Sequence, residues 1–308
     1  MMTISGQWVK NLIDNGVFYQ WLLGGKRLHL QHGPIDLVIE AMGDCEMVAQ
    51  AYRQAHEAFG TVLTDLVSEL DSLRKPLMKR ATELQGPVAK RMYQAAMPCC
   101  ELDRVTPMIA VAGSVADHVL EAMLEGTALE RAYVNNGGDI ALWLAPGQAF
   151  TVGICENPET GAVAANVELQ ACDAIRGIAT SGWRGRSHSL GIADAVTVLA
   201  ACAADADTAA TLIANAVDLP GSSHVHREPA CHLSPDSDLG DRPVTVAVDT
   251  LTPEEVAKAL ERGRLKAEQL SEMRLVSAAY INLAGCNVVC QNESGSARQT
   301  LSAGAMHA

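Results

Sequence analysis

The chain has 308 residues, of which 48% are hydrophobic and only 4% aromatic. Lys and Arg total 23 against 36 Asp and Glu, a formal net charge of -13, which argues against nucleic-acid binding because no basic stretch offsets phosphate repulsion. The length suffices for one large domain or two ordinary ones, with a core that needs no disulfides. The nine scattered cysteines are typical of reduced thiols in a cytoplasm.

The N-terminal stretch has no basic region followed by an apolar run and a cleavage site, and no run of about 18 apolar residues stands out. We therefore expect a cytoplasmic protein without membrane contact. Residues 1–25 show weak periodicity and predict a partly ordered segment or a short docking helix. Residues 26–291 are expected to form a single α+β unit, and residues 292–308 a loose tail.

In the first half of that unit, the sequence predicts two strands, three helices and four further strands. The strands at 27–32 and 35–42 flank a His-Gly-Pro turn. The helices are expected at 45–73, 87–96 and 108–124, since apolar residues recur there at helical spacing and prolines mark several of their limits. Gly-containing turns separate short strands, which predicts an antiparallel meander over 132–134, 140–145, 150–155 and 163–169.

The second half centres on residues 176–217, which place a Gly/Arg loop, a strand at 194–199 and an Ala-rich helix from about 204 in succession. A strand at 244–248 follows a Gly/Ser/His/Pro-rich passage. The next helix starts at Pro253, because Thr252 and Glu255 form a capping box. A last strand is expected within 278–289. The fold class is therefore α+β.

The Gly/Arg loop, TSGWRGRS at 180–187, offers flexible backbone, hydroxyls, two guanidiniums and one aromatic face. These groups suit a ligand that carries phosphate and a flat ring. The alternative is a solvated surface loop. The candidate binding residues are Thr180, Ser181, Gly182, Trp183, Arg184 and Arg186.

The Ala-rich helix carries Asp207, Thr211 and Asn215 at four-residue spacing, so three oxygen-bearing side chains share one face. Asp207 and Thr211 are hard oxygen donors one turn apart, which predicts a catalytic Mg²⁺ site completed by water and a substrate pyrophosphate. In the alternative, Asp205 caps the helix and Asp207 only favours its dipole.

Five segments, AVAGSVAD (110–117), VNNGGDI (134–140), TSGWRGRS, GIADAVTVLA (191–200) and PDSDLGDR (235–242), follow the order and spacing of the ApbE-like proteins. The chain thus resembles relatives of the FAD:protein FMN transferases, and more narrowly a bacterial and archaeal branch of that group. The resemblance implies a duplicated T-fold-like arrangement of antiparallel sheets and long helices, with a central cleft near residues 109–217. It also implies FAD or another flavin nucleotide, with Mg²⁺, as cofactors.

The turn Asn135 to Asp139 is by itself a hairpin signal. In the ApbE-like proteins the equivalent turn lies beside the flavin nucleotide, so the resemblance makes candidate contacts of Asn135, Gly137, Gly138 and Asp139. Gly113 and Ser114 stand where backbone amides at the start of a helix could meet an anion.

The chain also departs from the transferases. Their Gly-x-Ala-Lys-Gly run reads Gly113-Ser-Val-Ala-Asp117, without the lysine, and their His-x-x-Asp-Pro-x-Thr-Gly segment is replaced after His188. Three functions stay open. They are Mg²⁺-dependent FAD pyrophosphate cleavage with FMN transfer, a role in sulfide assimilation toward homocysteine that uses the same cleft, and non-catalytic flavin binding. In each case we expect an anionic small-molecule ligand and a homodimer; a protein acceptor is not identifiable, and PDSDLGDR is expected to close the cleft.

Overall fold

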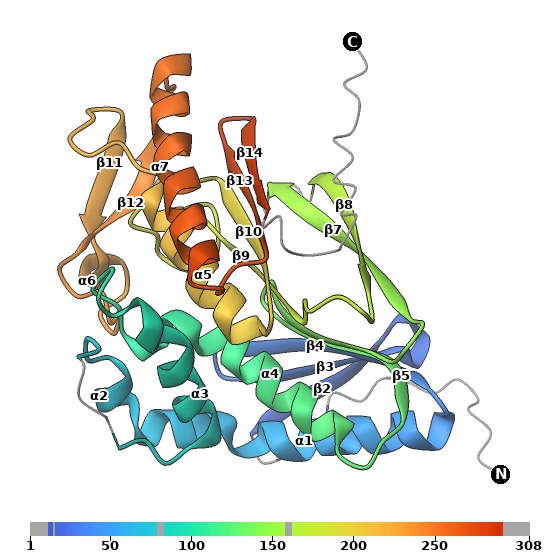
Figure 1. Cartoon of the computed structure of the whole chain (residues 1–308). Helices are drawn as coiled ribbons and strands as arrows, with labels where there is room; N and C mark the ends of the chain where they lie inside the picture. The colour runs from blue at the N-terminus through green and yellow to red at the C-terminus, as the bar shows by residue number, and fades with distance from the viewer. Residues whose placement is uncertain (1–11, 15, 79–82, 158–161, 292–308) are drawn as a thin grey trace.

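The computed structural model describes residues 12–14, 16–78, 83–157 and 162–291. A ten-stranded sheet in the order β1-β2-β3-β4-β5-β6-β9-β10-β13-β14 forms its centre (Figure 1), and every neighbouring pair is antiparallel. Its strands are β1 (Leu12–Asp14), β2 (Val17–Leu22), β3 (Arg27–His32), β4 (Ile35–Gly43), β5 (Leu129–Asn136), β6 (Asp139–Leu144), β9 (Gly177–Ser181), β10 (Ala195–Ala200), β13 (Ala278–Leu283) and β14 (Cys286–Gln291). The α+β class with a large antiparallel sheet is confirmed.

The longer helices lie along one face of this sheet in two groups. Helices α1 (Cys45–Ser68) and α4 (Val111–Leu124) pack their apolar residues on β3, β4 and β5. Helices α5 (Ala203–Ala216) and α7 (Pro253–Glu272) pack on β9, β10, β13 and β14. The short helix α3 (Pro87–Ala96) contacts both α4 and α5, and Figure 1 shows α4 and α5 meeting at the middle of the molecule.

A separate hairpin of β7 (Ala149–Asn157) and β8 (Ala162–Gln170) covers part of the opposite face. Its apolar side chains form a third cluster with residues of β6, β9, β10 and β13. A second two-stranded sheet, β11 (Val225–Pro229) with β12 (Pro243–Val248), lies beside α7 and is joined through α6 (Ala230–Leu233). The remaining short helices are α2 (Leu70–Leu73), η1 (Leu23–Gly25), η2 (Met97–Cys99) and η3 (Pro107–Ala110).

Several expectations from the sequence were wrong. Residues 12–14 and 16–25 form strands and a 3-10 turn, not the docking helix that was one of the two expectations for residues 1–25, because β2 completes a hairpin with β3. The expected meander is interrupted, since β6 pairs with β9 while β7 and β8 pair only with each other. The last strand is a hairpin that turns at Ala284 and Gly285. The tail, 292–308, lies outside the described residues.

One apolar run was also overlooked. Within the described residues, the 18 residues of Pro107–Leu124 form a helical stretch long and apolar enough to cross a membrane, and 56% of it is buried inside the protein. This burial is what a core helix shows, since α4 packs against α1, α3, α5 and the sheet. Length and composition alone therefore give only weak evidence of membrane contact.

Candidate functional site

Helices α4 and α5 cross in backbone contact at Gly113. A Cβ atom added to this glycine would lie 2.2 Å from the carbonyl oxygen of Ala203 and 2.8 Å from the amide nitrogen of Ala204. No side chain can enter such a gap, so this crossing requires glycine. The small apolar residues of α5 are fully buried, which fixes the face that α5 turns toward the sheet; these are Ala206, Ala209, Ala210 and Ile213, with Val217 directly after the helix.

Each of these two helices caps the N-terminus of the other. In neither helix does the side chain of the N-cap residue accept a hydrogen bond from an amide of the first turn. Asp117 of α4 accepts hydrogen bonds from the amides of Ala203 (3.0 Å) and Ala204 (2.9 Å), while Asp207 of α5 accepts one from the amide of Gly113 (3.0 Å). The carboxylates thus satisfy amides that a helix leaves unpaired in its first turn, and they complement its dipole.

Asp207 lies beside a second carboxylate, that of Asp139 at the start of β6. Burial raises the pKa of Asp207 to about 7, although hydrogen bonds from the amides of Gly113 and Ala112 favour the charged form. Burial, and then the charge of Asp207, raise the pKa of Asp139 well above its usual range, while the Thr180 amide opposes this. Elements α5 and β6 are neighbours, and the two partly buried carboxylates lie close enough for the charge of Asp207 to act on Asp139. The sequence placed both residues in the site, and the structure brings them together.

The other members of the polar stripe lie along the same helix face. Thr211 is partly buried one turn beyond Asp207. Asn215 accepts hydrogen bonds at Oδ1 from the Leu190 amide (2.9 Å) and the Ser189 hydroxyl (3.4 Å). Asn215 therefore fixes the loop that follows TSGWRGRS, while Thr211 lies between this contact and the carboxylate pair.

The Gly/Arg loop lies beside the Asn-Gly-Gly-Asp turn. Nη1 of Arg186, an exposed residue, lies 3.3 Å from the position of a Cβ on Gly137. The turn itself is a two-residue hairpin loop in which Gly137 and Gly138 adopt φ angles of 65° and 117°, and the Gly138 amide donates to Oδ1 of Asn135. Asn135 therefore has a structural role in the turn.

Trp183 and Arg184 have partners within the protein. Oδ1 of Asp194 accepts hydrogen bonds from Nε1 of Trp183 (3.2 Å) and Nε of Arg184 (2.7 Å), and the guanidinium lies 4.5 Å from the centre of the indole ring. The expected arrangement, with Trp183 stacking a flat ligand between two phosphate-clamping arginines, would thus need these contacts to rearrange. Gly182 is fixed as well, because an added Cβ would meet the Asp194 carbonyl oxygen at 2.5 Å.

The remaining candidate residues lie in the framework of the site. Thr180 and Ser181 belong to β9, and the Thr180 hydroxyl is 2.9 Å from that of Thr197 on β10. Ser114 is fully buried, and its hydroxyl oxygen has no hydrogen-bond partner among the described residues. The amide of Gly113, expected to meet an anion, is taken by Asp207.

The PDSDLGDR segment forms a loop anchored next to the site. The Thr106 hydroxyl donates to Asp238 (2.6 Å), just before η3 leads into α4. Nε2 of His188, in the loop that follows TSGWRGRS, lies 3.2 Å from the Ser234 hydroxyl oxygen. This segment and the adjacent Ser234 therefore link Thr106, just before α4, to the loop that follows TSGWRGRS. The closing of a cleft by PDSDLGDR stays a prediction.

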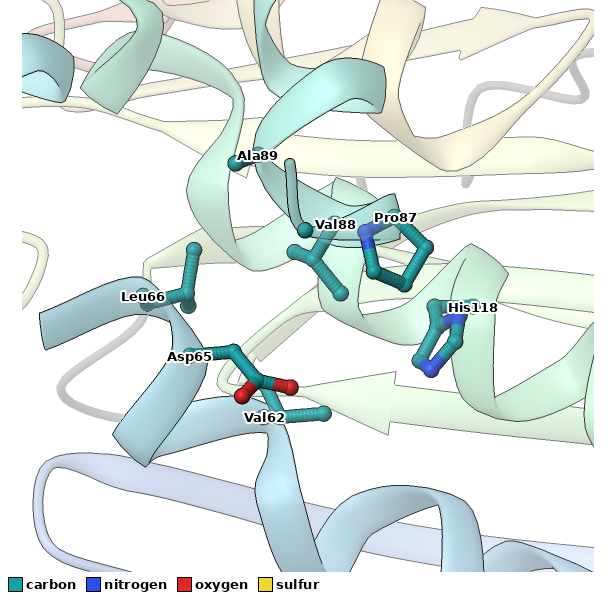
Figure 2. Close-up of a pocket in the computed structure, with 8 residues that line it drawn as sticks. Val62, Asp65, Leu66, Pro87, Val88, Ala89 and His118 are labelled. Carbon is teal, nitrogen blue, oxygen red and sulfur yellow. The ribbon is translucent and has the colours of Figure 1, made fainter. Parts of the chain in front are cut away.

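Two hollows elsewhere do not enlarge this site. The one in Figure 2 has a volume of about 10 Å³, room for one water molecule at most, and is lined by Val62, Asp65, Leu66, Gly86, Pro87, Val88, Ala89 and His118. A groove of about 310 Å³ lies between α7 and β14, and its lining includes none of the candidate site residues. Among the described residues, no group of three or more His, Cys, Asp or Glu is placed to hold a metal ion.

Sequence reasoning missed two residues that organise the site, Asp117 and Asp194. Both were within motifs noted above, but no role was given to either. The available signal for Asp117 was a carboxylate inside an otherwise apolar helix, since such a group is seldom buried without a partner. Asp194 directly precedes a fully buried strand, where a carboxylate also requires hydrogen-bond donors.

The comparisons with known proteins agree with the motifs. The profile of the family described as "AbpE bacteria" matches residues 19–292. A UPF0280 protein of Methanothrix thermoacetophila is 39% identical over 132 residues, which are 42% of this chain and 52% of that protein. A UPF0280 protein of Methanothermobacter thermautotrophicus is 31% identical over 185 residues, 58% of this chain and 70% of that protein.

The match to the Methanothrix protein spans about half of that protein's length. Among solved structures, the flavinyl transferase ApbE of Pseudomonas stutzeri in its apo form has a TM-score of 0.43 at 12% identity, covering 83% of this chain and 90% of its own. The ApbE protein of Thermotoga maritima has a TM-score of 0.39 at 12% identity, covering 87% of this chain and 96% of its own.

Proposed function

Since this chain belongs to the family described as AbpE bacteria, we propose that it binds a flavin nucleotide such as FAD together with Mg²⁺. In this proposal the cation is held by the Asp139–Asp207 pair. The ligand's pyrophosphate lies between this pair and Arg186, and the motifs of the ApbE-like proteins supply the choice of ligand.

The observation that carries the proposal is the meeting of these two carboxylates. The contacts that fix them in the described residues come from backbone amides, those of Gly113 and Ala112 for Asp207 and that of Thr180 for Asp139. Burial disfavours the charged form of both carboxylates, and hydrogen bonds from neutral amides offset this only in part. A divalent cation would stabilise the charged form of both, and carboxylate oxygens are ligands that Mg²⁺ prefers.

The chemistry of the donor set fits Mg²⁺ better than Zn²⁺ because it contains oxygen alone. Thr211 adds a hydroxyl on the same helix face, and water or ligand oxygens would complete six-fold coordination. Bound Mg²⁺ would supply neutralisation of the charge on the pyrophosphate. Arg186, exposed beside Gly137, would orient a phosphate through its planar guanidinium.

Whether binding leads to transfer depends on groups that differ from the transferases. The lysine of their Gly-x-Ala-Lys-Gly run is absent, and Asp117 in this run is the cap of α5. In this run of α4, the Asp117 side chain therefore holds α5. The proposed function is therefore flavin-nucleotide binding, and it does not require FMN transfer to a protein.

Calorimetric titration with Mg²⁺ and FAD tests the proposal. Wild type is expected to bind FAD with Mg²⁺-dependent affinity, and Asp207→Asn to lose at least tenfold in that affinity. Asp205→Asn is the matched control, because Asp205 lies in the first turn of the same helix and hydrogen-bonds Cys202 instead. Equal Mg²⁺ dependence in all three proteins would rule out the cation site.

A second measurement separates binding from catalysis. Release of AMP from FAD, followed by chromatography, would indicate cleavage of the pyrophosphate, whereas tight binding without AMP would support a non-catalytic flavin-binding subunit. If FAD, FMN and ADP all fail to change the melting temperature, the flavin proposal is wrong. A different anionic ligand, as in the sulfur-metabolism alternative, would then be sought for the same site.

A further inference from the structure

We infer that Asp117 is a positioning residue that sets the place of Asp207 by fixing the first turn of α5 on α4. This inference rests on the proposed function for its consequence in cation binding. Its geometric core, the dependence of Asp207 on Asp117, can be tested separately.

Asp117 is connected to Asp207 through hydrogen bonds to two backbone amides and one turn of α5. Both oxygens of the Asp117 carboxylate are used, Oδ1 by the Ala203 amide and Oδ2 by the Ala204 amide. These are the first two residues of α5, and Asp207 follows Ala203 by four positions, about one helical turn. A shift or rotation of this first turn therefore moves the Asp207 carboxylate with it.

Asp207 has little freedom to absorb such a shift. Its Oδ2 accepts the Gly113 hydrogen bond at 3.0 Å, and the added-Cβ distance of 2.2 Å at Gly113 shows that the two backbones already touch. Aspartate also has a short side chain with only two torsion angles. The contact with Gly113 and the approach to Asp139 thus depend on where α5 begins.

The burial of Asp117 supports a role beyond stability. Its side chain is 9% exposed, and the Arg91 guanidinium is 4.0 Å away and also bound to Glu121. A buried carboxylate loses hydration that one distant arginine restores only in part. A Ser, Thr or Asn at the N-cap position, now Cys202, would cap α5 locally without this cost, but it would not tie α5 to α4.

The two helices cap each other at the point where they cross, so each cap depends on the position of the other helix. Asp117 holds the start of α5, and Asp207 holds the start of α4. Loss of one carboxylate should therefore loosen the amide that the other one holds. A simple helix cap predicts a different outcome, because its loss affects only the helix that it caps.

The test compares Asp117→Ala and Asp117→Asn with wild type. Glu121→Gln is the control, since Glu121 lies one turn further along α4, binds the same Arg91 and contacts neither cap. Amide hydrogen exchange is followed by NMR at Ala204, which Asp117 holds, and at Gly113, which Asp207 holds. Val198, in the middle of β10, reports global opening.

We expect Asp117→Ala to accelerate exchange at both Ala204 and Gly113 by at least tenfold relative to Val198. Asp117→Asn should give a smaller acceleration at both sites, because the amide oxygen can still accept one hydrogen bond. Glu121→Gln should change neither. If Asp117→Ala does not fold, Asp117→Asn still decides, through the ratio of exchange at Gly113 to that at Val198.

Faster exchange at Ala204 with unchanged exchange at Gly113 in both variants would overturn the inference, because Asp117 would then be a local cap alone. Mg²⁺ titration of the folded variants gives a second readout, with an expected loss of about tenfold in affinity for Asp117→Ala and a partial recovery for Asp117→Asn. If wild type binds no Mg²⁺, the proposed cation site is wrong while the exchange data still decide the positioning role. If wild type binds Mg²⁺ and both variants bind it equally well, the inference is wrong and the cation site stands.

Discussion

Helix α7 begins differently from α4 and α5. Oγ1 of Thr252 accepts the Glu255 amide at 3.3 Å, and Oε2 of Glu255 accepts the Thr252 amide at 2.9 Å, so α7 caps itself within four residues. The caps of α5 and α4 come from residues 86, 87 and 94 positions away. A helix with a local cap can form early and alone, whereas α4 and α5 have their caps only after they have met.

This difference determines which side chains are held in a fixed position relative to a second helix. The capping box of α7 fixes one helix end and nothing else. The exchanged caps fix two helices relative to one another, and Asp207 is part of that junction. The same dependence makes the site sensitive to changes in residues that touch no ligand, as the following predictions state.

The largest effect is expected from Gly113→Ala. The added methyl would meet the Ala203 carbonyl oxygen, a backbone atom that no rotamer can move, so the helices must separate and both caps weaken. We expect the free energy of unfolding to fall by at least about 3 kcal/mol, measured by urea denaturation. Gly60→Ala in α1 is the control, because its added Cβ meets nothing within 4 Å, and it should be neutral or raise stability by up to about 1 kcal/mol.

A second large effect is expected from Asp194→Ala. This carboxylate accepts hydrogen bonds from Trp183 and Arg184, and from the amide of Ala284 at 2.6 Å, directly after β13. The substitution removes the acceptor from all three donors. We expect a loss of about 2–3 kcal/mol. The emission of Trp183 should also shift to longer wavelength. Asp194→Asn, which keeps one oxygen, should lose less; an equal loss in both would show that charge rather than hydrogen bonding holds the loop.

The sequence predicted the elements that are specified locally. The bounds of α3 and the start of α7 agree with the structure because Pro87, Thr252, Pro253 and Glu255 are signals within a few residues of the helix ends. The hairpin between β13 and β14 was missed, since Ala284 adopts a φ of 51° without being Gly or Asn, the residues that usually mark such a turn. The first strands were missed because pairing, of β1 with β2 and of β2 with β3, determines them rather than their own periodicity.

In the site, too, the sequence predicted the parts that local motifs specify. The motifs indicated that the Asn-Gly-Gly-Asp turn and the Gly/Arg loop belong together, and Arg186 does lie beside Gly137. The pairing of Asp139 with Asp207 could not be derived, because it depends on the angle at which α5 leaves β10. The same holds for Asp117, whose partners lie across the helix crossing. The sequence did not indicate that Trp183 donates a hydrogen bond to Asp194, because the two residues are eleven positions apart.

The pH dependence of stability isolates the carboxylate pair. Burial raises the pKa of Asp207 from 3.8 in the unfolded chain to about 7, so its protonated form is favoured in the folded state. Its contribution to stability is therefore full below about pH 4 and is lost as the pH rises toward 7. Without divalent cations, we expect the free energy of unfolding of wild type relative to Asp207→Asn to fall by on the order of 2 kcal/mol between pH 5 and pH 8.

Urea denaturation at several pH values measures this difference. Subtracting the Asp207→Asn curve removes the groups that titrate alike in both proteins and leaves Asp207 with its effect on Asp139. A flat difference would mean that Asp207 is ionised throughout and that burial does not govern it. Added Mg²⁺ should flatten the wild-type curve if the pair holds a cation, because the ion stabilises the charged form.

The smallest effect is expected at the self-capped helix. Thr252→Ala removes the hydroxyl that accepts the Glu255 amide, which should lower the free energy of unfolding by about 1 kcal/mol. Thr252→Ser keeps an oxygen there and should lose only a few tenths of a kcal/mol. Because this cap contacts neither α4 nor α5, exchange at the Gly113 amide, relative to that at Val198, should be the same as in wild type. Faster relative exchange at Gly113 in Thr252→Ala would show that the two kinds of cap are coupled and that the crossing of α4 and α5 is not an independent unit.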